Sequence, residues 1–268
     1  MNMWHVIVLA LVQGFTELLP ISSSAHLILV PSFLGWPDQG LEFDLALHTG
    51  TLFAVLTYFR QDVSNMLFTW LRHWSEPKAH PNAYLMWVVL LATIPAGIAG
   101  LVGKDWVETH LRSEWIIACT SLGYGLLLGI AYSWGKKHTT ITAATEITLT
   151  VGLIIGFAQV LALVPGTSRS GITMTAALFC GVAPILAARF SFLLSIPLIT
   201  ASSLLLIKDL LVSPLPIDWL ALLVGCIVSA LSAFVCIHWF LQLLTRIGMW
   251  PFAIYRVLLG IGLLFWLM

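Results

Sequence analysis

At Leu19-Pro20-Ile21-Ser22-Ser23-Ser24, an apolar segment of the chain is interrupted by a proline and three hydroxyl side chains. A second interruption reads Val164-Pro165-Gly166-Thr167-Ser168-Arg169-Ser170-Gly171. A proline cannot continue a helix, and the residue before it leaves the helical region. Serine and threonine just beyond such a break favour the N-cap position of the next helix. Each stretch therefore predicts a helix end, a polar turn and a new helix.

The composition around these breaks indicates a membrane protein. Apolar residues make up 59% of the 268 residues, and Asp, Glu, Lys and Arg together only 9%. A soluble domain carries about 25% charged and about 45–50% apolar residues. This composition excludes a soluble globular enzyme and a disordered chain. Twelve acidic residues balance twelve Lys and Arg residues, so the net charge gives no indication of a nucleic-acid partner.

Ten apolar segments can be assigned. A spanning helix needs about 20 mostly apolar residues. Six segments meet that length within tolerance: roughly 43–59, 82–102, 114–134, 186–207, 217–240 and 250–268. Four others are too short or too polar to span alone: roughly 4–19, 22–35, 147–163 and 168–181. We therefore expect an all-α integral membrane protein with six transmembrane helices.

The four short segments form two pairs, one on each side of each break. We predict that each pair is a re-entrant hairpin that enters the membrane, turns at a polar tip and returns to the same side. Non-helical backbone at that depth must be buried in protein or line a wet cavity. The alternative is two ordinary spans with a proline kink. Arms of about 14 residues favour the hairpin, because they are too short to cross the hydrocarbon core.

The order of segments predicts an internal duplication. Pro20 and Pro165 lie 145 residues apart, and each break is followed by three spans. Repeat 1 would cover about 1–140 and repeat 2 about 141–268, within one integral membrane domain, 1–268. Because three spans is an odd number, the second repeat must be inverted. Broken helices of inverted repeats meet near the midplane and place a binding site there.

The basic residues orient this arrangement. One side would hold seven of them: Arg60, Arg72, Lys78, Lys136, Lys137, Arg189 and Arg246. The other would hold three (Lys104, Arg112 and Lys208) and both chain ends. The positive-inside rule favours the first side as cytoplasmic, so both termini would face outward. We expect the loop at 60–81 to lie on the cytoplasmic side and the first hairpin to open outward.

Polar side chains at the first break suggest chemistry. Glu17 lies just before the break, and Gln13 is on the same helical face. A carboxylate at the bilayer centre costs about 2.5–3.5 kcal/mol on insertion scales, so it marks a functional position by default. Ser22, Ser23, Ser24 and His26 follow the break. An acid, hydroxyls and an imidazole suit nucleophilic or acid–base work. The alternatives are a snorkelling acid, helix-capping serines and a satisfied intrahelical histidine.

Arg169 is the most informative residue of the second break. An arginine in mid-membrane is costly unless it meets an anion. Gly166, Thr167, Ser168 and Ser170 offer free backbone N–H groups, hydroxyl donors and the positive end of a helix, which together can cradle an anion. The guanidinium fork matches phosphate geometry. The alternative is a purely structural ion pair between Arg169 and Glu17.

A meeting of the two tips would suit a highly charged phosphate group. Glu17 would then act as a general base, or as a ligand for Mg²⁺ or Ca²⁺ bridging to the phosphate. Apolar walls would suit a lipid tail. Three other polar residues have milder interpretations: His48 is expected to be a helix-packing residue, and Arg256 and His238 are expected to pair locally. The four cysteines are expected to be small apolar residues in helices.

Several motifs resemble the undecaprenyl-pyrophosphate phosphatase family. The first signature is similar to Gln13-Gly14-Phe15-Thr16-Glu17-Leu18-Leu19-Pro20-Ile21-Ser22-Ser23-Ser24-Ala25-His26, and the second to Pro165-Gly166-Thr167-Ser168-Arg169-Ser170-Gly171. Phe43-Asp44-Leu45-Ala46-Leu47-His48-Thr49-Gly50-Thr51-Leu52, the segment 188–197 and the pair Tyr255-Arg256 also resemble that family. The resemblance covers essentially the whole chain.

The resemblance implies an enzyme that removes the terminal phosphate of undecaprenyl pyrophosphate and so recycles the lipid carrier for cell-wall synthesis. It implies the bacterial inner membrane, a site facing the periplasm, a divalent cation and a link to bacitracin resistance. It places catalytic roles on Glu17, Ser23, His26 and Arg169. Substrate binding would fall to seven residues: Gln13, Ser22, Ser24, Gly166, Thr167, Ser168 and Ser170. Some members carry Glu where this chain has Gln13, so a metal site here would rest on Glu17.

Three points stay open from the sequence. The nucleophile is Ser23, His26 or an activated water. The partners are the lipid substrate and membrane lipid, and a second copy of the chain, in a homodimer, is a further candidate. The rival functions are a secondary transporter or flippase for a phosphorylated lipid, and a structural membrane protein, because inverted repeats with hairpins also build transporters.

Overall fold

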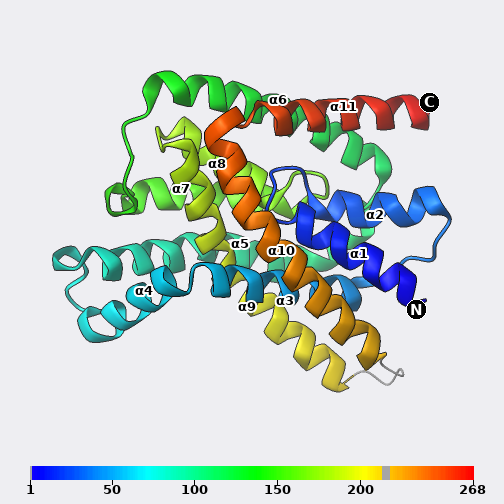
Figure 1. Ribbon diagram of the computed structural model, residues 1–268, viewed down its shortest axis with the longest axis horizontal. Coiled ribbons are helices and arrows are strands. Elements are labelled where there is room, and N and C mark those ends of the chain that lie inside the picture. Colours follow the sequence, from blue (N-terminus) through cyan, green and yellow to red (C-terminus); the bar gives the residue numbers. More distant parts are fainter. Residues whose placement is uncertain (1, 213–217) are drawn as a thin grey trace.

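The computed structural model describes residues 2–212 and 218–268, and these residues are all-helical (Figure 1). The helices are α1 (Met3–Thr16), α2 (Ser23–Leu34), α3 (Leu41–Tyr58), α4 (Arg60–His73), α5 (Pro81–His110), α6 (Glu114–His138), α7 (Leu149–Val160), α8 (Arg169–Phe179), α9 (Pro184–Val212), α10 (Trp219–Ile247) and α11 (Trp250–Leu267). Three short 3₁₀ turns lie at Pro77–Ala79, Ala144–Glu146 and Leu161–Leu163. Within this part of the chain there is no strand, only an isolated bridge between Ile141 and Val182.

Five of the described helices are long and apolar enough to cross a membrane: Pro81–Gly103, Glu114–His138, Pro184–Lys208, Trp219–Ile247 and Trp250–Leu267. They match five of the six predicted spans and make this a multi-pass membrane protein. The predicted span 217–240 begins at a residue outside the described ones. The sixth prediction, 43–59, falls on α3, which is not among the five. The first turn of α3 carries Glu42 and Asp44, which lower its apolar character.

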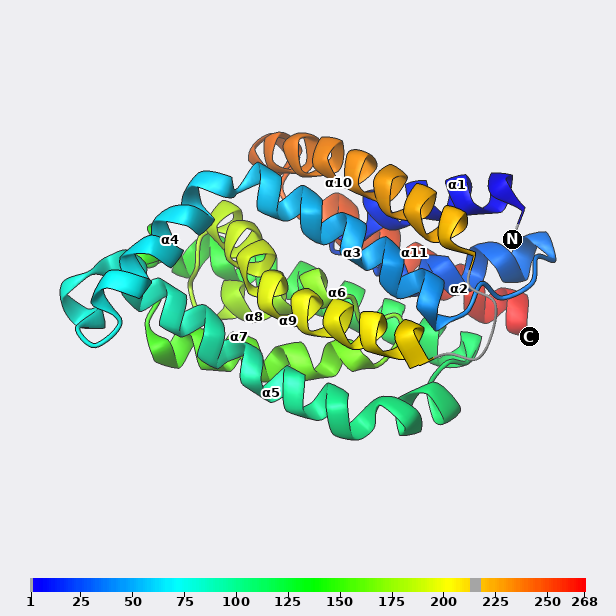
Figure 2. The same cartoon turned by 90° about the horizontal axis from the view of Figure 1, so that it is seen from below.

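The four short segments form helices α1, α2, α7 and α8, of 11 to 14 residues each. In both views α1 and α2 lie in the half of the molecule where the two chain ends are marked N and C (Figures 1 and 2). Helices α7 and α8 lie in the other half. The two breaks therefore face each other near the middle of the bundle, and the pairs open towards opposite ends.

The prediction that 60–81 is a loop was wrong for most of its length. Residues Arg60–His73 form α4, which lies at the end of the bundle away from the chain termini (Figure 2). The sequence indicates polarity here, but the apolar side chains recur along one face, as in an amphipathic helix. Met66 of α4 is buried against the core, whereas the apolar side chains of Phe68 and Leu71 are exposed on the surface.

Helix packing follows a reciprocal pattern. α1 packs on α10 and α7 packs on α5, while α3 meets α9 and α6 meets α11. Gly14 brings α1 against Ser232 and Ala233 of α10, and Gly156 brings α7 against Ala92 of α5. A side-chain carbon at either position would overlap the neighbouring helix. Glycine has none, so the two helix backbones can approach closely. The two short helices that end at the breaks are thus held by equivalent glycine contacts.

Candidate active site

The two breaks have the same local geometry. Ser22 caps α2 and accepts a hydrogen bond from the backbone N–H of Ala25, and Ser168 caps α8 and accepts one from Gly171. Both caps have positive φ values, 74° for Ser22 and 70° for Ser168. Positive φ is costly for a residue with a side chain and is kept where the surrounding structure holds it, often at functional sites. The predicted capping role of these serines is confirmed.

The two breaks also contact each other directly. Ser170 Oγ, one residue into α8 beyond Arg169, donates to the carbonyl oxygen of Leu19 at 2.8 Å. The residues after each cap occupy matching places: the Ser24 hydroxyl lies 3.2 Å from that of Ser22, and the Ser170 hydroxyl 3.2 Å from that of Ser168. The helix N-termini of α2 and α8 are therefore brought to one place, as the meeting of the two tips requires.

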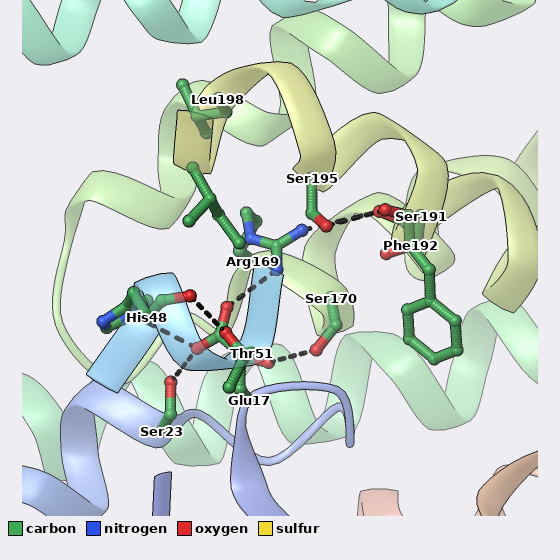
Figure 3. Close-up of polar contacts among 12 residues, drawn as sticks. Glu17, Ser23, His48, Thr51, Arg169, Ser170, Ser191, Phe192, Ser195 and Leu198 are labelled. Carbon is green, nitrogen blue, oxygen red and sulfur yellow. Dashed lines mark hydrogen bonds and ion pairs between the residues drawn. The ribbon is translucent and has the colours of Figure 1, made fainter. Parts of the chain in front are cut away.

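Glu17 lies at the centre of this meeting point (Figure 3). It follows the last residue of α1, and only 5% of its surface is exposed. Its Oε1 pairs with Arg169 Nη2 at 2.7 Å. Its Oε2 accepts hydrogen bonds from Ser23 Oγ at 2.5 Å and from Gln13 Nε2 at 3.1 Å. Three predicted site residues, from both breaks, thus surround the acid.

His48 is the partner of Glu17 that the sequence did not predict. Its Nε2 lies 3.2 Å from Glu17 Oε2 (Figure 3). Its Nδ1 lies 2.7 Å from the carbonyl oxygen of Asp44 on its own helix, α3. Nδ1 faces a carbonyl oxygen and must therefore carry a proton. In a neutral ring, Nε2 would then be an acceptor facing the Glu17 carboxylate, which is also an acceptor. Next to a carboxylate, the protonated ring satisfies both contacts. The interpretation of His48 as a packing residue was wrong.

His26 lies in the first turn of α2 and contacts both its own helix and α11. Its Nδ1 lies 2.7 Å from the carbonyl oxygen of Ser22, and its Nε2 lies 2.6 Å from the hydroxyl of Tyr255 on α11. The two rings are also stacked. His26 is thus directed by its hydrogen bonds towards α11, whereas His48 takes the position beside Glu17.

Arg169 is anchored on its far side by α9. Its Nη1 donates to the carbonyl oxygen of Ser191 at 3.5 Å (Figure 3). Thr173, one turn along α8, shares a hydrogen bond with the Ser191 hydroxyl at 2.7 Å. Thr173 also donates to the Arg169 carbonyl oxygen at 2.8 Å. These contacts direct the guanidinium towards the first break.

Arg256 also reaches the breaks, against the expectation that it pairs locally. It donates from α11 to the carbonyl oxygen of Gly166 at 2.8 Å and to that of Pro20 at 3.4 Å. The local pairing expected for His238 is confirmed, since its Nε2 lies 3.0 Å from the Gln242 amide one turn along α10.

Some polar groups at the site have spare hydrogen-bonding capacity. Among the described residues, the buried Oε1 of Gln13 and the buried hydroxyl of Thr167 have no hydrogen-bond partner. Buried polar atoms are nearly always paired, so such atoms point to an interaction with water or a ligand. Gln13 belongs to the first break and Thr167 to the second.

The fold and the site define a class of protein: a multi-pass helical membrane protein with a buried carboxylate, arginine and hydroxyl site between two helix N-termini. Comparison with known proteins agrees with that class. The model of the family described as "Bacitracin resistance protein BacA" matches residues 6–262, and the chain belongs to this family.

Curated relatives resemble the chain over its full length. "Undecaprenyl-diphosphatase 1" of Pseudoalteromonas translucida is 51% identical over 267 residues, covering 100% of this chain and 99% of the relative. "Undecaprenyl-diphosphatase" of Teredinibacter turnerae is 52% identical over 261 residues, covering 97% of this chain and 98% of the relative. The protein of the same name from Hahella chejuensis is 51% identical over 267 residues, covering 100% and 99%.

Proposed function

We infer that this chain is an undecaprenyl-diphosphatase, a membrane hydrolase that converts undecaprenyl diphosphate and water into undecaprenyl phosphate and inorganic phosphate. The observation that carries the inference is that Glu17 contacts both Ser23, in the first break, and Arg169, in the second. An acid, a hydroxyl and a guanidinium at two helix N-termini form a set that can bind phosphate and move a proton. The full-length relatives with that name support the same function.

The anion would bind where the two helix N-termini converge. Backbone N–H groups at a helix start, together with the helix dipole, favour a phosphate. The Arg169 guanidinium can form two parallel hydrogen bonds to phosphate oxygens and stabilise the charge that spreads over them during transfer. The substrate must compete for Arg169 with Glu17, which is 2.7 Å away. Binding of the terminal phosphate would therefore open that ion pair and release the carboxylate.

The released Glu17 would serve as the base. Ser23 already donates its hydroxyl proton towards Glu17 Oε2. Attack of Ser23 Oγ would form a bond to the terminal phosphorus and break its bond to the bridging oxygen, which leaves with undecaprenyl phosphate. The hydroxyl proton passes to Glu17, and water then hydrolyses the phosphoserine. Direct attack by a water held in the same place is the alternative. Full activity of a Ser23→Ala protein would exclude the serine route.

His48 would support the same proton transfer. Its contact with Glu17 Oε2 allows it to stabilise the carboxylate and to return a proton to a leaving oxygen. His26 would contribute from the side of α11 through its hydrogen bond with Tyr255. We therefore place His48 in the reacting group and His26 at its edge.

A divalent cation, Mg²⁺ or Ca²⁺, fits the residues of this site. Magnesium is commonly held by one or two carboxylates together with substrate phosphates. Glu17 would provide one carboxylate. Gln13, whose amide nitrogen already bonds to Glu17, would provide its Oε1, which has no hydrogen-bond partner. When bound, the cation would offset the negative charge of the diphosphate. Glu17 and Gln13 would be its protein ligands.

Phosphate release tests the function and the cation together. Pure protein in detergent, supplied with undecaprenyl diphosphate and Mg²⁺, should release inorganic phosphate without any ion gradient. EDTA should abolish release, and added Mg²⁺ or Ca²⁺ should restore it. Absence of release from folded protein would favour a transporter or flippase of a phosphorylated lipid. Release that persists in EDTA would exclude the cation and leave the hydrolase.

The membrane arrangement that we propose has six spans, two re-entrant hairpins and inverted repeats. α3 would be the sixth span, the pairs α1–α2 and α7–α8 the hairpins, and α4 a helix at the membrane surface. The reciprocal packing of α1 on α10 and α7 on α5 supports two inverted halves, 1–140 and 141–268. The balance of basic residues supports outward termini, and we place the protein in the bacterial inner membrane with its site open to the periplasm.

Cysteine labelling in intact cells tests this orientation. In a variant whose four native cysteines are replaced, Pro37→Cys should react with an impermeant maleimide, because the α2–α3 loop would face the periplasm. Ser75→Cys, in the segment after α4, should react only after the membrane is permeabilised. The opposite labelling pattern would contradict the orientation, and labelling of both from outside would contradict the span count.

A further inference from the structure

Arg256 is a buried cation in the last spanning helix. Its side chain is fully buried, with 0% of the residue exposed. Among the residues that the structure describes, no carboxylate lies within ion-pairing distance of it, and its Nε has no hydrogen-bond partner. A buried charge is costly unless it is paired and hydrogen-bonded. An arginine at this buried position therefore needs a structural or functional reason.

The hydrogen bonds of Arg256 join three separate parts of the chain. Its Nη2 donates to the carbonyl oxygen of Gly166, in the second break, at 2.8 Å. Its Nη1 donates to that of Pro20, in the first break, at 3.4 Å. Nη2 also lies 3.4 Å from the carbonyl oxygen of Thr120 on α6. One guanidinium thus contacts the backbone of both tips and of the helix behind them.

The surrounding glycines leave room for this side chain. A Cβ atom on Gly171 would lie 2.6 Å from Arg256 Nη1, and one on Gly125 would lie 2.8 Å from Arg256 Cβ. Neither glycine has a positive φ, so it is the space, and not the backbone conformation, that requires glycine here. Gly171 lies in the first turn of α8, two residues after Arg169. Gly171 therefore leaves room for the guanidinium, and Gly125 lets α6 approach α11 closely at Arg256.

We propose that Arg256 is a positioning residue that clamps the two helix breaks together, so that Arg169 from one break and Glu17 and Ser23 from the other share one phosphate. The unpaired carbonyls at a helix end attract a cation, and a planar fork with five donors can reach several of them at once. A lysine has the charge but not the fork. The proposal rests on the proposed phosphatase function for its kinetic consequences only.

The clamp predicts coordinated loosening of both tips. In an Arg256→Met protein, we expect amide hydrogen exchange to become at least tenfold faster in peptides covering 18–24 and in peptides covering 164–170. Exchange in 186–200 of α9 should not change. The control is Arg246→Met, an exposed arginine in the last turn of α10. This readout does not depend on activity. Unchanged exchange at the tips, or faster exchange along the whole chain, would overturn the clamp.

The kinetic consequence is a fall in kcat with little change in KM. Arg169 and the start of α8 would still bind phosphate, but the groups of the first break would be misplaced, and a misplacement of about 1 Å can cost about 100-fold in rate. We expect about that loss for Arg256→Met, and recovery to within about tenfold of wild type for Arg256→Lys, which retains the charge. An inactive wild type with looser tips in the variant would refute the function and leave the clamp intact.

A second variant keeps the test decisive if Arg256→Met does not fold. Gly171→Ala favours the helical state of α8, since alanine is the better helix former. Its methyl group would lie 2.6 Å from Arg256 Nη1 and 3.0 Å from Ser168 Oγ, so the closest group that must move is Arg256. We expect it to melt no lower than wild type and still to lose kcat and tip protection. In a double variant with Arg256→Lys, the two losses should be less than additive, because both act on one contact. Wild-type kcat and tip exchange in Gly171→Ala would refute the clamp.

Discussion

Replacing Arg169 with alanine should lower kcat/KM for undecaprenyl diphosphate by at least about 1,000-fold. An arginine that stabilises a transferring phosphoryl group is worth about 10³–10⁵ in rate. Arg169→Lys retains the charge but loses the fork, so about a 100-fold loss should remain. The measurement is phosphate release by purified, monodisperse protein, with rates referred to the folded fraction.

The matched control for this prediction is Arg189→Ala. Arg189 pairs with Asp62 at 2.8 Å, but both side chains are about half exposed, and exposed pairs contribute about 0–1 kcal/mol. We expect its activity to stay within about twofold of wild type. Arg169→Ala should also melt at a lower temperature, because removing one partner of a buried pair costs about 3–5 kcal/mol. Wild-type activity in folded Arg169→Ala would refute the phosphate site.

Replacing Glu17 with glutamine should have an effect of similar size, about 100- to 10,000-fold in kcat, the range for loss of a general base. The substitution retains the shape and removes only the charge and the basicity. A glutamine at this position can still receive the hydrogen bond from Ser23, so the position of the hydroxyl should change little. The measurement is again phosphate release, at several Mg²⁺ concentrations.

The cation concentrations separate the two roles of Glu17. If the acid is mainly the base, the loss should persist at saturating Mg²⁺. If it mainly holds the cation, much of the activity should return as Mg²⁺ rises. Glu76→Gln, an exposed acid before the 3₁₀ turn Pro77–Ala79, serves as the control. Full activity of Glu17→Gln at every Mg²⁺ concentration would remove Glu17 from both roles.

The positions of the two breaks could be predicted from the sequence because proline and hydroxyl residues act locally. A proline at 20 or 165 ends a helix whatever surrounds it, and Ser22 and Ser168 then cap the next one. Glu17 and Arg169 could be named as candidate site residues for a similar reason, since any charge in an apolar segment needs a partner, and the structure pairs them. The positive φ of the two capping serines could not be predicted, because a serine has no local preference for that conformation.

The contacts of His48 and Arg256 were missed because they depend on tertiary packing. His48 lies on α3, and the spacing of 31 residues from Glu17 carries no helical periodicity that would join them. Arg256 lies on α11 and reaches carbonyl groups, which no side-chain pattern can reveal. The amphipathic helix α4 was missed because it is too polar for a span, and polar segments between spans were assumed to be loops.

The central claim is that Glu17 and Arg169 form a phosphate site and not only an ion pair. Phosphate release by the charge-swapped protein, Glu17→Arg with Arg169→Glu, tests it most directly, with both single variants and the melting temperature measured alongside. The swap can restore an ion pair across the two breaks, but it moves the cation away from the start of α8 and the base away from Ser23. We predict a higher melting temperature than either single variant with phosphate release still at least about 1,000-fold below wild type. Recovery of release together with stability would contradict the claim and leave the pair a structural bridge.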